Sequence, residues 1–153
     1  MPNSTHIATL LRGVYFGGNW TDVNLKSMLA DVTWQQATTK IQDFNTIAAL
    51  VFHINYFVEV ALTVVQGGPL DAHDKYSFDL PPIQSQEDWE KLLDTFWSKA
   101  ETLAHAIEQL PENKLDEVFV LEKYGSYYRN LHGVIEHTHY HLGQMVLLKK
   151  MLA

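Results

Sequence analysis

The chain has 153 residues, of which 46% are hydrophobic and 19% charged, and this composition predicts one globular domain over residues 1–153. The formal charge of −7 argues against nucleic acid or an anionic membrane as a partner, because phosphate groups require clustered Lys and Arg side chains. There is no cysteine, so disulfides, thiolate metal sites and a cysteine nucleophile are excluded. Any metal must therefore be bound through nitrogen and oxygen atoms.

The first residues lack the basic and long apolar regions of a signal peptide. We find no stretch of about 18 apolar residues without polar interruption, the length that a membrane-spanning helix needs. We therefore expect a soluble, cytoplasmic protein that does not span a membrane.

The N-terminal segment shows apolar residues at helical spacing from Ile7 onward. This pattern predicts a first helix that starts after Ser4 or Thr5 and ends at the glycine pair 17–18. A short helix is expected over about residues 21–30, and the segment 33–43 has no clear pattern.

A second long helix is predicted over roughly residues 46–66, with Asn45 as its N-cap and the Gly-Gly-Pro run 67–69 as its end. At about 100° per residue, His53 lies within the apolar arc of this helix. Asn55 falls on the polar side.

The remainder of the chain predicts a polar loop over residues 70–84, a third long helix over about 85–109 and a last helix over about 125–152. Loops longer than about 12 residues are often functional. Four long amphipathic helices and no convincing strand predict an all-α protein, a four-helix bundle.

Histidines are the candidate metal ligands in this sequence. His137 and His141 are four residues apart, which places both imidazoles on one face of the last helix and makes a two-ligand half-site for a transition metal. His53 is a third inward candidate. His132 and His139 are expected to project toward solvent.

Alternative interpretations of these histidines stay open. A lone histidine on an apolar arc, such as His53, is usually a core residue with one hydrogen bond, and a His-x-x-x-His pair also occurs by chance. Three inward imidazoles on two long helices nevertheless match the way bundles build metal sites, and burying them without a shared partner would be costly. The zincin motif His-Glu-x-x-His is absent because Thr138 follows His137.

The last helix also resembles a known family. The run from His137 to His141, followed by Gly143 and Gln144, is similar to the last-helix signature of the DinB/YfiT-like superfamily of metal-dependent enzymes. The stretch Leu50-Val-Phe-His53 resembles the first ligand motif of that family. The similarity extends to residues 20–37 and to Phe78-Asp-Leu-Pro81.

The resemblance implies an up-down-down-up four-helix bundle that forms a homodimer. It implies a divalent metal, nickel or zinc, on His53, His137 and His141. Relatives with known reactions include transferases and isomerases that use a low-molecular-weight thiol, which would be a partner beside a small-molecule substrate.

Three neutral imidazoles would leave an open position on a divalent ion, which lowers the pKa of bound water to about 7 or binds a thiolate. One hypothesis is therefore a metal-dependent enzyme, either a hydrolase or a thiol-dependent S-transferase. The catalytic residues are unknown, since no general base is visible and both Glu59 and Glu136 are expected to face outward. Gln144 either orients a ligand or bound water, or makes a helix-packing hydrogen bond.

Two other hypotheses remain. One is a metal-binding or stress-response protein without turnover, which the missing base favours. The other is a helical interaction module without metal, and it predicts that His53 lies far from His137 and His141.

Overall fold

The computed structural model describes residues 1–153 and contains helices and loops without any strand. The predicted all-α class is confirmed. The α-helices are α1 (Asn3–Phe16), α2 (Leu25–Leu29), α3 (Trp34–Thr38), α4 (Ile47–Val65), α5 (Gln86–Glu108) and α6 (Tyr127–Leu152). Three 3-10 helices lie in the connections: η1 (Asp74–Tyr76), η2 (Glu112–Asp116) and η3 (Glu122–Tyr124).

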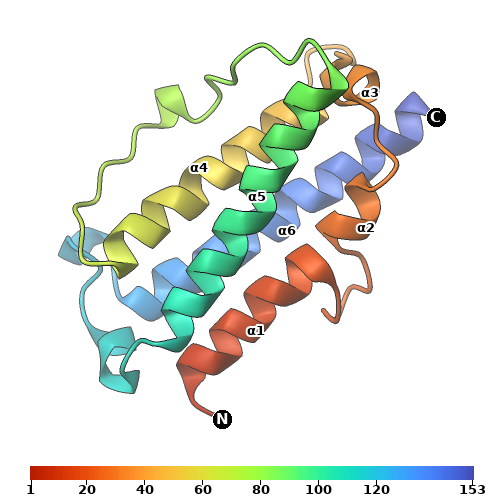
Figure 1. The fold of residues 1–153 in the computed structure, drawn as a ribbon. Helices are drawn as coiled ribbons and strands as arrows, with labels where there is room; N and C mark the ends of the chain where they lie inside the picture. The colour runs from red at the N-terminus through yellow and green to blue at the C-terminus, as the bar shows by residue number, and fades with distance from the viewer.

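Four long helices pack side by side. Each of α1 and α4 contacts both α5 and α6, and α2 and α3 connect α1 to α4 (Figure 1). The colours in Figure 1 show that α4 and α5 run in one direction and that α1 and α6 run in the other. Because α4 and α5 are parallel neighbours, the chain between them must return along the length of α4. The long loop that carries η1 makes this return.

One cluster of 33 buried hydrophobic residues forms the core. Tyr15 of α1 and Phe96 of α5 pack with their ring centroids 5.0 Å apart. The indole N–H of Trp89 donates a hydrogen bond to the carbonyl of Val32 over 2.9 Å. This bond ties the start of α5 to the α2–α3 connection and satisfies a buried donor.

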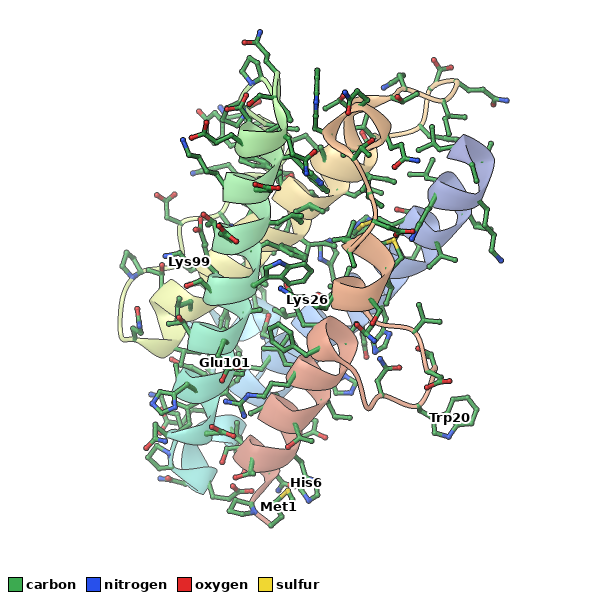
Figure 2. All side chains as sticks on the ribbon, turned by 45° about the vertical axis from the view of Figure 1, so that its right-hand side comes forward. Met1, His6, Trp20, Lys26, Lys99 and Glu101 are labelled. Carbon is green, nitrogen blue, oxygen red and sulfur yellow. The ribbon has the colours of Figure 1, made fainter.

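Ion pairs at the surface also connect α1 and α5. The guanidinium of Arg12 lies 2.7 Å from a carboxylate oxygen of Glu101 and also pairs with Glu108. Figure 2 shows Glu101 on α5. It also shows Trp20, in the segment that follows α1, with its side chain pointing into solvent, and this side chain is 99% exposed.

Helix α4 is the most apolar of the long helices. By length and composition it is the one helix that could cross a membrane, yet 61% of its most apolar window is buried inside the protein. That burial is typical of the central helix of a bundle.

The N-terminal helices differ in their bounds from the sequence prediction. Helix α1 starts at Asn3, ahead of the predicted start. It ends at Phe16, and Gly17, with a φ of 116°, follows as the C-cap. The short helix predicted over residues 21–30 covers only Leu25–Leu29, because the side chain of Asn24 caps it by accepting from the N–H of Ser27. The unassigned segment holds α3.

Two expectations for α4 were wrong. Its N-cap is Thr46 rather than Asn45, because the Thr46 hydroxyl accepts from the N–H of Ala49 over 3.1 Å. Asn55, expected on the polar side, is buried, since α4 is enclosed over more of its circumference than an outer helix would be. The predicted end is confirmed, and Gly67 has a φ of 91° there.

The bounds of α5 and α6 agree with the prediction to within two residues. Ser85 caps α5 and Ser126 caps α6, each through its hydroxyl group. His137 and His141 lie near the middle of α6.

Candidate metal centre

Three histidines meet between α4 and α6, two helices that pack against each other. The Nε2 atom of His137 lies 3.0 Å from Nε2 of His53 and 3.1 Å from Nε2 of His141. The nitrogen atoms available as ligands all lie within 4.8 Å of one another. His53 and His141 are each only 8% exposed, and His137 is half-buried. The three residues could hold a metal ion.

The tautomer of His53 follows from its neighbours. Its Nδ1 atom lies 3.0 Å from the hydroxyl oxygen of Ser77, and that hydroxyl donates its own proton to the carbonyl of Asp74 over 2.7 Å. The Ser77 oxygen must therefore accept a hydrogen bond from the Nδ1–H group of His53. In a neutral His53 the Nε2 atom is then unprotonated, and its lone pair points toward the cluster.

The same argument applies to His141. Its Nδ1 atom lies 2.7 Å from the amide oxygen Oε1 of Gln144, and an amide oxygen can only accept. A neutral His141 therefore also presents a bare Nε2. Both lone pairs face Nε2 of His137, which can donate at most one proton.

This donor set fits a cation. The three Nε2 atoms share at most one proton, so in at least one of the two close contacts two nitrogen lone pairs face each other. A shared metal ion would relieve this repulsion. Two imidazole nitrogens that are each about 2.1 Å from one ion lie about 3.0 to 3.4 Å apart at coordination angles near 90° to 110°. The observed separations of 3.0 and 3.1 Å fall in that range.

Aromatic side chains pack against two histidines of the cluster. The ring of Phe78 stacks on that of His53, with the centroids 4.1 Å apart and the planes at 4°. Phe57 contacts His53 and His137 edge-on, with both centroid distances at 5.2 Å. These rings pack apolar surface against His53 and His137 and restrict the rotation of both imidazoles.

Burial also sets the charge of the histidines. Desolvation is the main cause that lowers the pKa of His137 to about 4, with the nearby His141 and His53 adding to it. Desolvation and the proximity of His141 also lower the pKa of His53. Both side chains are therefore neutral at physiological pH, which is the form that binds a metal.

A groove of about 800 Å³ opens beside His137. Most of its lining residues are hydrophobic and come from α4, α6 and the segment before α6. Its polar lining includes Arg129, His132 and Glu136. A mostly apolar cavity with a few polar groups, next to a possible metal site, is the usual form of a small-molecule site.

The structure brings together the three histidines that the sequence singled out. The expectation of the metal-free hypothesis, that His53 lies far from the other two, is wrong.

His132 and His139 are half-buried rather than fully solvent-exposed. Nδ1 of His132 lies 2.9 Å from a carboxylate oxygen of Glu136, and both residues line the groove. Glu136 is exposed, as expected, and its side chain lines this groove.

Sequence reasoning missed the partners that the long loop supplies. Ser77 is 1% exposed and Phe78 covers His53, although neither lies near His53 in the chain. The available signals were the length of the loop and the segment Phe78-Asp-Leu-Pro81. Nothing in the sequence pairs Ser77 with His53.

The fold and the cluster together define an all-helical protein with a possible three-histidine metal site. The family model of the DinB superfamily matches residues 20–145, and the chain belongs to this superfamily. The matched region includes all three histidines and Gln144. Searches of the curated proteins and of the solved structures found no match.

Proposed function

We propose that the protein binds a divalent transition metal, nickel or zinc, through Nε2 of His53, His137 and His141, and that it is a metal-dependent enzyme. The observation that carries the proposal is the anchoring of His53 by Ser77 and of His141 by Gln144. Each anchor keeps a proton on Nδ1, so that Nε2 is free to bind a metal.

The family's up-down-down-up bundle is part of this proposal, and the directions of the four long helices in Figure 1 support it. The single domain over residues 1–153, the homodimer and the cytoplasmic location stay predictions.

Hydrolysis and thiol-dependent S-transfer are the two reaction types that suit the site. Three protein ligands leave a coordination position open, and a divalent metal there would supply an activated water or thiolate. The chain itself would bind a small-molecule substrate in the groove with its reactive end beside His137. The pair His132–Glu136 lines the same groove and can accept or donate a proton there.

A metal-binding or stress-response role without turnover is the second candidate. The observation that favours it concerns Glu136, the one acidic residue that lines the groove. Its carboxylate is exposed and bonded to His132 rather than to the three-histidine cluster, so no carboxylate base is hydrogen-bonded to the cluster.

Metal content tests the proposal. Tag-free wild type and the variants His53→Ala, His137→Ala and His141→Ala would be loaded with zinc or nickel, dialysed and analysed for bound metal. We expect close to one ion per chain in wild type and a large loss in each variant. His105→Ala is the matched control, because His105 is exposed and is not part of the cluster. Wild type without metal after loading would refute the proposal.

The open position is tested by cobalt substitution. If one coordination position holds exchangeable water, a small anion or thiol will change the visible spectrum of the cobalt-loaded protein. A spectrum that does not respond would favour the role without turnover.

A further inference from the structure

We propose that the groove binds a ligand with an apolar body and a single carboxylate group, with the carboxylate on Arg129 and the body lying over Gly133 toward His137. This inference deepens the proposed function by naming the substrate class, and it rests on that function only for the ligand's role as substrate. Binding at Arg129 and Gly133 does not require the metal.

Three lining residues of the groove form a row along α6. Arg129, Gly133 and His137 follow one another at intervals of four residues, so they lie on one side of the helix. At 1.5 Å per residue, the row is about 12 Å long. A ligand along this row would contact the guanidinium at one end and the histidine cluster at the other.

Gly133 leaves the middle of the row open. A Cβ atom added there would meet no heavy atom within 4 Å. A helix with an interior glycine is less stable than the same helix with an alanine. At position 133 no close contact within the chain requires a glycine. The space above Gly133 is thus available to the body of a ligand.

Arg129 is the one Lys or Arg side chain that lines the groove. It is exposed, and its Nη1 group donates to the carbonyl of Tyr124 over 2.9 Å. No carboxylate of the chain pairs with it, although the protein carries a net charge of −7. It also lies in the first turn of α6, where the helix dipole favours an anion.

The charges of the groove favour a monoanion. Glu136 lies seven residues beyond Arg129 and faces the same groove, close to the end that His137 occupies. Its negative charge disfavours a second anionic group at that end. One guanidinium balances the single charge of a carboxylate but only part of the charge of a phosphate dianion. Phe57 and Val60 of α4 and Phe119 and Leu121 of the connection add apolar walls to the groove. A volume of about 800 Å³ suits a small organic molecule.

Calorimetric titration with two matched probes tests the carboxylate. The probes are 6-phenylhexanoate and its neutral amide, titrated into zinc-loaded and metal-free wild type, Arg129→Gln and Lys91→Gln. Lys91→Gln removes one positive charge from α5, which does not line the groove. We expect the acid to bind at least tenfold more tightly than the amide in wild type and in Lys91→Gln. In Arg129→Gln the two affinities should become equal.

Several results would overturn the proposal. These are no binding of either probe, equal binding of acid and amide in wild type, or a preference for the acid that survives in Arg129→Gln. If that surviving preference appears only with zinc, it would indicate that the carboxylate binds the metal instead.

Substitution of Gly133 tests the path of the apolar body. Gly133→Phe fills the row and should weaken both probes at least tenfold, whereas Gly133→Ala adds only one methyl group and should bind both nearly as wild type does. Circular dichroism checks that each variant is folded. Unchanged binding in a folded Gly133→Phe variant would contradict the proposed path.

Zinc content measured on the same samples separates the two proposals. Failure of the metal site would leave the Arg129 effect intact in zinc-free protein. Failure of the present inference would leave zinc bound and binding of the acid independent of Arg129.

Discussion

Gln144 follows His141 by three residues on α6, and its amide oxygen lies 2.7 Å from Nδ1 of that histidine. The contact decides which nitrogen of His141 carries the proton, because an amide oxygen can only accept. Ser77 does the same for His53 from a loop rather than from the same helix. Two of the three imidazoles are thus oriented before any metal binds, and each orientation can be tested separately.

Replacing Gln144 should weaken metal binding without unfolding the protein. Loss of a group that orients a ligating histidine costs about 10- to 100-fold in metal affinity. We expect this loss for Gln144→Ala and little or none for Gln144→Glu, which keeps an acceptor oxygen. Competition with a chromophoric chelator measures the affinity. Wild-type affinity in Gln144→Ala would assign Gln144 to helix packing alone.

Ser77→Ala should have a similar effect through His53. Without the hydroxyl oxygen, Nδ1 of His53 loses its acceptor and the imidazole can change tautomer or rotate. We expect a loss of about tenfold or more in zinc affinity. Ser98→Ala on the exposed face of α5 is the control and should bind zinc as wild type does. Equal affinities in the two variants would show that the loop does not position His53.

Metal should stabilise the folded protein. Free zinc at about 100 times its dissociation constant contributes about 2.7 kcal/mol, which raises the Tm of a chain of this size by roughly 5 to 10 °C. We expect this shift in wild type and in His105→Ala, and its absence in His137→Ala. Differential scanning fluorimetry with and without zinc measures it. A shift of the same size in His137→Ala would place the bound metal elsewhere.

The metal-free protein should lose stability as the pH falls from about 6.5 to about 4. The pKa of His137 is about 4 in the folded state against 6.5 for an ordinary histidine, so the unfolded chain binds more protons between these values. The lowered pKa of His53 acts in the same direction. Urea unfolding across this range should give a shallower pH dependence for His137→Gln than for wild type. Identical slopes would contradict the assigned burial of His137.

The N-cap of α4 can be tested with two adjacent residues. Thr46→Ala should lower the free energy of unfolding by about 1 kcal/mol, because the N–H of Ala49 loses its acceptor. Asn45→Ala should be nearly neutral, since the side chain of Asn45 does not cap the helix. Urea unfolding of both variants compares them. A larger loss for Asn45→Ala would restore the original sequence prediction.

Local patterns in the sequence were sufficient for the long helices and for part of the site. The spacing of His137 and His141 places them on one face of a helix wherever that helix lies, so their pairing follows from the sequence itself. The end of α4 just before Gly67 and the bounds of α6 were predictable for the same reason, because residue type and spacing act within a few residues.

Only the tertiary structure decided the rest. His53 is 84 residues from His137 in the chain, and the packing of α4 against α6 brings their nitrogens to 3.0 Å. The return loop places Ser77 and Phe78 on His53, and the burial of Asn55 depends on how many neighbours surround α4. Periodicity shows which residues share a helix face, but the neighbour that covers that face is set by how the whole chain minimises its exposed apolar surface.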